Sequence, residues 1–448
     1  MKKIQTILVL ICLSFSGVYA QDLLSREAAL ALALENNFGI QMSKNANEIV
    51  KNNSEILNSG YLPTVSILGG STLNASDSEI EFPGQFLEDG SQRPNANLND
   101  QESKRFNAGV NLNYTLFDGF GRKYIYKRLK EQYALSELQL RQTIEQTILQ
   151  LFSVYFNVAQ LSEATANLEQ ALAVSKDRQK RAESSFSFGQ TNKLAVLNAQ
   201  VDVTNDSINL LQTKQELDNA KRDLNLILNL PIEQDFRVDT QVIFTPEVQI
   251  SQWIETAPQF NVDLLQQKSF KQINAYDIKV SQSGYLPTLG LVGSYGWNLN
   301  QSPASAFFPG TNNTTFSLGV GANLTWNLFD GGRTITQVKN AKITYENQTL
   351  QEQEIQLTFE RDIINAKQSY KNAIKIFEIQ DKQVETGTYN FERSQAQYRL
   401  GSITAIEFRQ AQINLRNAQI QRAAAKYQAK LAELRLIQLS GQLLNVAL

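Results

Sequence analysis

The sequence predicts an α+β membrane protein in which three chains share a twelve-stranded β-barrel, four strands from each chain, that continues into a long α-helical coiled-coil barrel. Three observations predict this fold class. The 448-residue chain has an internal two-fold repeat, each half carries segments with a period of two, and each half carries unusually long helical segments. Because a repeat fixes how often each element recurs, every element is expected twice.

The repeat is visible in short motifs that return in the same order. A Gly-Tyr-Leu-Pro-Thr motif begins at Gly60 and returns 224 residues later at Gly284. A Leu-Phe-Asp-Gly motif ends at Gly119 and returns 212 residues later, ending at Gly331. We therefore expect a first repeat over residues 21–230, a linker or equatorial segment over 231–253, and a second repeat over 254–448.

Between the two motifs of each half, apolar residues alternate with small polar ones, from Phe106 to Leu116 and again from Phe316 to Leu328. This period is typical of strands with one apolar and one polar face. Each half is expected to contain a β-hairpin, at about residues 61–118 and 285–329. The strands reach the roughly 9 to 11 residues that cross a membrane as tilted β structure. Polar loops are expected at 71–103 and 300–315.

The remaining segments predict helices. Arg122 to Ser185 and Arg333 to Arg399 contain no proline and hardly any glycine, so each is expected to form one long helix. A shorter helix with seven-residue apolar spacing follows each of them, and such heptads predict coiled-coil packing. A half-length helix is expected before each hairpin, at about residues 24–59 and 254–282.

Gly, Pro and Asp residues that recur in both repeats mark the corners between strands and helices. Gly60 falls where a helix must end and is expected to supply a left-handed cap, and Pro63 prevents the helix from continuing. Asp118, followed by a glycine, falls where a strand gives way to a helix and is expected to cap the first amides. The second repeat predicts the same roles, so the expected corner residues are Gly60, Pro63, Asp118, Gly119, Gly284, Pro287, Asp330 and Gly331.

Composition restricts the function. Residues 1–20, with two early lysines and an apolar run, are typical of a secretory signal peptide cleaved before Gln21. The single cysteine, Cys12, lies within it, and the sequence has no histidine. Thiol nucleophiles, histidine bases and the usual zinc ligand sets are thereby removed, so neither an enzyme nor a bound cofactor or metal is expected. The net charge is −2, or −4 without the two leader lysines, which gives no electrostatic reason to bind nucleic acid.

The strand count predicts oligomerisation. An open sheet in lipid leaves backbone groups unsatisfied, at a cost of roughly several kcal/mol each. Two chains would supply eight strands, a barrel that side chains fill, whereas three would supply twelve strands and leave a lumen. A homotrimer in contact with membrane lipid is therefore expected. The alternative for the strand pattern is a soluble β-sandwich, but that fold needs more strands.

Taken together, the doubled order of helix, Gly-Tyr-Leu-Pro strand, Leu-Phe-Asp-Gly strand end, long helix, glycine turn and heptad helix resembles the TolC-like outer-membrane efflux protein family over the whole mature chain. The resemblance implies the exit duct of a tripartite efflux or type I secretion system. Its barrel would lie in the outer membrane of a Gram-negative-type cell and its helices in the periplasm. A periplasmic adaptor (membrane fusion) protein and an inner-membrane transporter would dock to it and supply the energy.

The resemblance also places a periplasmic tip, which opens and closes, at the two glycine turns. The residues expected to contact the adaptor are Phe188, Gly189, Gln190, Leu400, Gly401 and Ser402. Acidic rings are implied six and nine residues after the second glycine, where this chain has Glu407 and Gln410, and Tyr398 matches a tyrosine that ties the closed tip. These three residues are the expected channel constriction. The alternative for Glu407 is an ordinary solvated helix residue.

A passive, gated duct is thus the expected function. The alternative is a structural or adhesive coiled-coil protein of the envelope, anchored by its strands, which would not conduct ions. No Ser–Lys or paired-carboxylate constellation supports a hydrolase, and the charges of the helices are typical of solvated faces.

Overall fold

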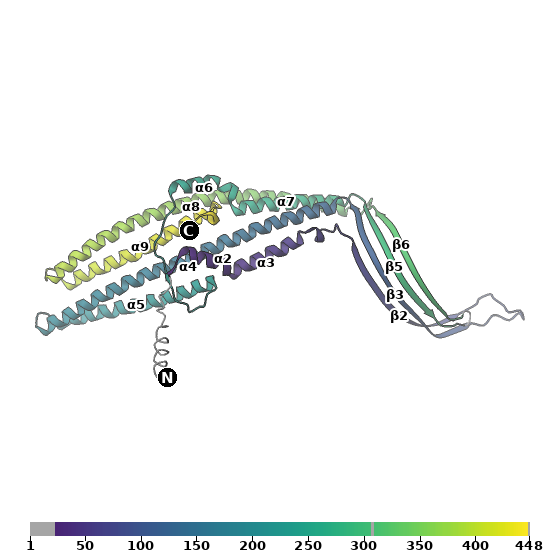
Figure 1. Ribbon diagram of the computed structural model, residues 1–448, viewed down its shortest axis with the longest axis horizontal. Helices are drawn as coiled ribbons and strands as arrows, with labels where there is room; N and C mark the ends of the chain where they lie inside the picture. The colour runs from purple at the N-terminus through teal and green to yellow at the C-terminus, as the bar shows by residue number, and fades with distance from the viewer. Residues whose placement is uncertain (1–22, 306–308, 447–448) are drawn as a thin grey trace, which may run out of the picture. The chain divides into compact units, whose positions relative to one another are not determined.

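The computed structural model describes residues 23–305 and 309–446, so the expected signal peptide lies outside the described residues. Figure 1 shows the elements in chain order. By their internal contacts they form two compact units, and both repeats contribute to each unit. The described part of the first unit comprises residues 23–48, 135–268 and 350–446. The second unit comprises Ile49–Ala134 and Ser269–Thr349. Among all the residues that the structure describes, no helix is both long and apolar enough to cross a lipid bilayer.

The second unit contains one antiparallel sheet with the order β2-β3-β5-β6, which confirms the two predicted hairpins. The strands are β2 (Thr64–Ile80), β3 (Ala96–Asp118), β5 (Thr288–Ser302) and β6 (Thr311–Thr325). Their register aligns the apolar positions in rows across the sheet, as in Ile67, Val110, Tyr295 and Leu318. The predicted alternation therefore gives one continuous apolar face.

The first polar loop is shorter than predicted. Much of the segment 71–103 belongs to β2 and β3, whose pairing extends to Ile80 and Ala96 with a register shift between Ser76 and Ser78. The prediction was wrong because a segment rich in Asn, Asp, Ser and Gln favours a loop by composition, whereas strand pairing needs only backbone groups in register.

The two long helices have equal lengths. Helix α4 (Gly121–Ser187) and helix α8 (Arg333–Arg399) each contain 67 residues, and the bounds of α8 agree with the prediction. The heptad helices are α5 (Lys193–Leu228) and α9 (Ala405–Leu439). Each long helix and the heptad helix that follows it form one helical hairpin, as Figure 1 shows.

The prediction of a single helix before each hairpin is wrong, because an asparagine divides each of them. Asn37 separates α2 (Arg26–Asn36) from α3 (Phe38–Asn53), and Asn261 separates α6 (Glu247–Phe260) from α7 (Val262–Ser283). Both asparagines have extended backbones, and each side-chain oxygen accepts two amides of the next helix at 2.9–3.2 Å. Asn37 Nδ2 also donates to Ile227 O, and Asn261 Nδ2 donates to Leu439 O, at 3.0 Å each.

The strand-to-helix corners are held by the two aspartates. Asp118 Oδ2 accepts the amide of Arg122 at 2.8 Å, and Asp330 Oδ2 accepts the amide of Thr334 at 2.9 Å. These are helix-capping hydrogen bonds. The glycines that follow, Gly119 and Gly331, have φ values of 67° and 70°. Pro63 and Pro287 directly precede β2 and β5.

Gly60 and Gly284 differ, although both begin the same motif. Gly60 has the expected left-handed backbone, with φ of 75°. The expectation is wrong for Gly284, whose φ is not positive. A Cβ atom at Gly284 would lie 3.1 Å from Thr334 Oγ1, so its small size allows the start of α8 to approach.

The first unit is organised around an aromatic core on α4. Three aromatic residues of α4 are fully buried: Phe152, Tyr155 and Phe156. The ring of Phe156 stacks on that of Tyr427 of α9, with the ring centroids 5.5 Å apart. The segment between α5 and α6 packs on this core. Its short strand β4 (Arg237–Val238) pairs with β1 (Leu23–Leu24), and the Tyr155 hydroxyl donates to Leu24 O at 2.8 Å.

Candidate functional site

The two hairpin turns of the first unit have the same backbone conformation. Gly189 and Gly401 have φ values of 71° and 72°. In both turns the following residue closes the helix end: Gln190 N donates to Ser185 O at 2.8 Å, and Ser402 N to Gln397 O at 2.9 Å. This is the Schellman pattern, in which glycine adopts the left-handed conformation without strain.

The turns expose apolar side chains. Phe188 is 79% exposed and Leu400 is 81% exposed.

Glu407 lies in the first turn of α9 and forms a capping box with Thr404. The amide and the hydroxyl of Thr404 both donate to Glu407 Oε2 at 2.8 Å, and Glu407 N donates to Thr404 Oγ1 at 3.2 Å. The hydrogen bond from the Thr404 backbone, and then that from its side chain, lower the pKa of the Glu407 carboxyl. The carboxylate therefore stabilises the helix start while remaining exposed.

The other two residues of the expected constriction are engaged within the second hairpin. Gln410 Nε2 donates to Asn414 Oδ1 at 2.8 Å. The ring of Tyr398 stacks on Phe408 with centroids 5.0 Å apart, and Phe408 stacks on Phe391. Tyr398 thus joins the end of α8 to the start of α9. The structure brings Tyr398, Gln410 and Thr404 to the lining of one cavity of about 640 Å³.

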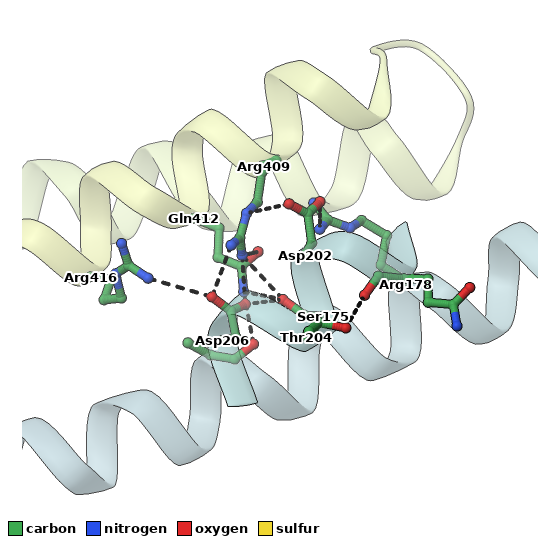
Figure 2. A network of polar contacts seen from close by, with 10 residues as sticks. Ser175, Arg178, Asp202, Thr204, Asp206, Arg409, Gln412 and Arg416 are labelled. Atoms are coloured by element: carbon green, nitrogen blue, oxygen red, sulfur yellow. Dashed lines mark hydrogen bonds and ion pairs between the residues drawn. The ribbon is translucent and has the colours of Figure 1, made fainter. Parts of the chain in front are cut away.

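A buried polar network joins the two hairpins a few turns from this tip, as Figure 2 shows. Arg409 and Gln412 point from α9 toward Asp206 of α5 and Ser175 of α4. Asp206, which has no exposed surface, accepts two hydrogen bonds from the Arg409 guanidinium at 2.7 and 2.8 Å and one from Ser175 Oγ at 2.6 Å. We call the following residues the tip network: Ser175, Arg178, Asp202, Asp206, Arg409, Gln412 and Arg416.

The rest of the tip network adds contacts between the same three helices. Asp202 pairs with Arg178 and lies 3.4 Å from Arg409 Nε. Gln412 Nε2 donates to Ala171 O at 2.8 Å. Arg416 Nη1 lies 3.5 Å from Asp206 Oδ1. Each aspartate is therefore shared by two arginines.

The electrostatics of the tip network favour the ionised pairs. Burial by itself raises the pKa of Asp206, but hydrogen bonds from Arg409 and Ser175 outweigh it, so this pKa lies below its usual range. Burial by itself lowers the pKa of Arg409, but Asp206 outweighs it and the pKa is raised. The charges are compensated only while α5 and α9 remain in contact, so the hairpins separate only if buried ion pairs break.

Sequence reasoning missed this network because it took the helix charges for solvated faces, which is wrong for Asp206. One signal was present in the repeat. Positions 212 residues apart hold a charged residue in one half and an uncharged one in the other: Asp206 corresponds to Ala418, Arg409 to Leu197 and Arg416 to Thr204. Acids in one repeat and bases in the other indicate pairing between repeats. Among the described residues, no cluster of acids resembles a metal site.

Comparison with known proteins places these features in a family. A family model described as "Outer membrane efflux protein" matches residues 29–230 and 253–442. The outer membrane protein TolC of Vibrio cholerae serotype O1 is 22% identical over 392 residues, which cover 86% of this chain and 83% of that protein. The outer membrane efflux protein BepC of Brucella suis biovar 1 is 24% identical over 235 residues, 52% of this chain and 50% of BepC.

Solved structures show the same fold. The Campylobacter jejuni CmeC outer membrane channel superposes with a TM-score of 0.73 at 18% identity, covering 93% of this chain and 86% of that one. The outer membrane protein VceC of Vibrio cholerae superposes with a TM-score of 0.71 at 14% identity, covering 93% and 96%.

Proposed function

We propose, from the premise that this chain belongs to the outer membrane efflux protein family, that three copies form an exit duct whose tip the tip network holds closed. The chain is an outer-membrane transport protein and not an enzyme. The observation that carries the gating proposal is Asp206, a fully buried carboxylate of α5 that accepts two hydrogen bonds from Arg409 of α9.

Two sets of unpartnered groups support the homotrimer. Among the described strands, β2 and β6 each have one neighbour, so each leaves a row of backbone donors and acceptors free to pair with another copy. Helix α8 also exposes apolar side chains at seven-residue intervals, at Ile343, Leu350, Leu357 and Ile364. We infer that a helix from another chain covers this heptad stripe. Three copies would enclose a lumen surrounded by membrane lipid.

The exposed tips support docking. We assign the contact with a periplasmic adaptor protein, and through it with an inner-membrane transporter, to Phe188, Gly189, Gln190, Leu400, Gly401 and Ser402. The exposed ring of Phe188 at one turn and the exposed side chain of Leu400 at the other offer apolar contact, and the glycines of the two turns have nearly equal φ values. The duct itself would be passive, whether it serves efflux or type I secretion. Residues 21–230 and 254–448 would be its two repeats, joined by the equatorial segment 231–253.

Current through single trimers in a planar bilayer tests the gate. Asp206→Asn and Arg409→Gln each remove one charge of the buried pair, so both are expected to raise the open probability and conductance. The matched control is Asp381→Asn, which breaks an exposed ion pair with Arg422 inside the second hairpin. A silent trimer for all variants would support the structural, non-conducting alternative.

We propose that Glu407 lines the constriction together with Gln410 and Tyr398. In the trimer, the three copies of the Glu407 carboxylate would then face one another. Glu407→Gln keeps a side-chain oxygen for the capping box but removes the charge. We expect lower cation selectivity and weaker block by divalent cations, measured as reversal potential and blocked current. Unchanged selectivity would return Glu407 to a purely capping role, without affecting the tip network.

A further inference from the structure

The polar face of the sheet in the second unit carries one charged residue away from the helix corners, Arg105 of β3. In the register, Arg105 pairs with Thr72 of β2 and with Asn300 of β5, and Asn300 pairs with Asn313 of β6. Side chains alternate between the two faces of a strand, so the register identifies the other residues of this face. In the four described strands they are all uncharged except Asp118, which caps helix α4 at the opposite end of the sheet.

The charged residues that lie close to Arg105, along β3 or across the hairpin, belong to the other face. They are Asp77, Glu79, Glu102 and Lys104. Lys104, for example, pairs with Leu73, and their row continues the apolar face. Asp100 lies in the β-bulge opposite Asp77, whose carboxylate accepts the Asp100 amide at 2.8 Å. The alternation therefore places the positive charge of Arg105 and these acids on opposite faces of the sheet.

Arg105 is the longest side chain on the polar face, and it is held in place. Its Nε donates to Asn300 Oδ1 at 2.9 Å, while the residue as a whole is exposed. In the described part of the chain no acid pairs with its guanidinium, so the charge is uncompensated. The rows between Arg105 and the helix corners include these glycines on the same face: Gly70, Gly109, Gly290, Gly296, Gly319 and Gly321. Among such short side chains, Arg105 is the group that can come nearest to a passing solute.

We propose that three copies of Arg105 form a ring that makes the outer part of the duct selective for anionic solutes over cationic ones. This inference rests on the proposed trimeric duct, in which the apolar face meets lipid and the polar face lines the lumen. Arg105 lies toward the strand ends that are remote from the helices, so the ring would stand near the outer mouth. Its positive charges attract anions and repel cations. This selectivity is opposite in sign to the one proposed for Glu407 at the tip.

The reach of the ring depends on salt, because a barrel of twelve strands leaves a wide lumen. At about 0.15 M ionic strength the screening length is about 8 Å, so the ring acts on solutes that pass close to the wall. At about 0.01 M it rises to about 30 Å, and the whole cross-section of the lumen would be affected. A steric or folding role of the Arg105 side chain would not depend on salt in this way.

Reversal potentials of purified trimers in a bilayer of uncharged lipid test the proposal, both in the unsubstituted chain and in the Asp206→Asn background, which is expected to be open. Arg105→Gln keeps a donor for Asn300 but removes the charge. We expect it to raise the cation-to-anion permeability ratio about twofold or more at about 0.01 M salt. At about 1 M salt, where the screening length is about 3 Å, the same variant is expected to change the ratio little.

The matched control is Lys104→Gln, which removes the same charge one residue away, on the opposite face of the sheet. It is expected to leave the permeability ratio unchanged at both salt concentrations. The proposal alone is overturned if the trimers conduct and Arg105→Gln gives the same ratio as Lys104→Gln at low salt. Trimers that are silent in both backgrounds would overturn the duct and this inference together.

Cysteine labelling tests the position of Arg105 without a current. The only cysteine of the sequence, Cys12, lies in the expected signal peptide, so Arg105→Cys would offer a single thiol. A water-soluble, sulfonated thiosulfonate reagent is expected to modify Arg105→Cys in reconstituted trimers and to spare Val110→Cys, which lies on the apolar face. The attached sulfonate should raise the cation-to-anion permeability ratio further than Arg105→Gln does. Equal labelling of the two cysteines, or no labelling of Arg105→Cys, would contradict the proposal.

Discussion

The two helical hairpins, α4–α5 and α8–α9, have nearly the same backbone and opposite charges where they meet. Their long helices have equal lengths, their turns share a left-handed glycine, and an asparagine in each repeat reaches the end of the heptad helix. Yet the first hairpin supplies both acids of the tip network, Asp202 and Asp206, together with Arg178, whereas the second supplies only bases, Arg409 and Arg416. Two identical hairpins would present the same charge to each other. A few side chains that differ between the repeats therefore make the electrostatic interaction between the two hairpins favourable.

The largest expected effect comes from removing the charge difference between the two hairpins at the tip network. Asp206→Ala leaves Arg409 buried without its partner, so we expect a loss of about 3–5 kcal/mol in the free energy of unfolding. Urea denaturation of the detergent-solubilised protein measures it. Asp381→Asn, in the exposed pair, is expected to change stability by about 0.5 kcal/mol or less. Equal losses for the two variants would contradict a special role for the buried contact.

Acid weakens the same contact without a substitution. The pKa of Asp206 is lower in the folded chain than in the unfolded one, where it is about 3.9. Its contribution to stability is therefore complete above about pH 4 and is lost as the pH falls through the folded value. We expect conductance to rise below about pH 4. In Asp206→Asn trimers, whose side chain does not titrate, this pH-dependent rise should be smaller.

The capping asparagines test whether the hairpins are equivalent away from the tip. Asn37→Ala and Asn261→Ala each remove two amide caps and one bond to a heptad-helix carbonyl. We expect each to cost about 1–2 kcal/mol. Asn261 is only 3% exposed, so its replacement is expected to cost more. A loss at only one position, in thermal or urea unfolding, would show that the repeats differ here too.

The turn glycines should give the smallest effects, and equal ones. A Cβ atom at Gly189 or Gly401 would meet no atom within 4 Å, so alanine adds only the strain of a left-handed backbone. We expect each Gly→Ala change to cost about 1 kcal/mol. Gly387→Ala, within α8, is the control, and it is expected to stabilise the helix by about 0.5–1 kcal/mol. Tm values for the three variants rank them directly.

Much of the fold could be predicted because its signals are local. The bounds of α8 follow from Asp330 and Gly401, one a capping residue and the other a turn residue. The strands of the hairpins could be predicted because apolar and polar residues alternate along each strand, and this alternation does not depend on how the strands pair. Asn37 could not be recognised as a helix break in the same way, since asparagine is tolerated within helices and its capping role depends on the carbonyl of Ile227, a residue far along the chain.

The candidate site was harder to predict because its chemistry depends on burial. Asp206 and Arg409 are ordinary helix residues in sequence, and only the packing of three helices removes them from water. Glu407 was recognised from a resemblance, but the structure adds a local use of its carboxylate, the capping box with Thr404.

The asymmetry between the repeats has a consequence for symmetry. A ring of three chains contains six hairpins, and with identical repeats it would have six equivalent boundaries. The tip network joins hairpins within a chain, whereas the exposed heptad stripe of α8 is available to the next chain. Ionic boundaries within a chain and apolar boundaries between chains would therefore alternate around the ring. A stimulus that acts on charges would then loosen every second boundary, so the aperture would widen by moving hairpins in a three-fold pattern and not a six-fold one.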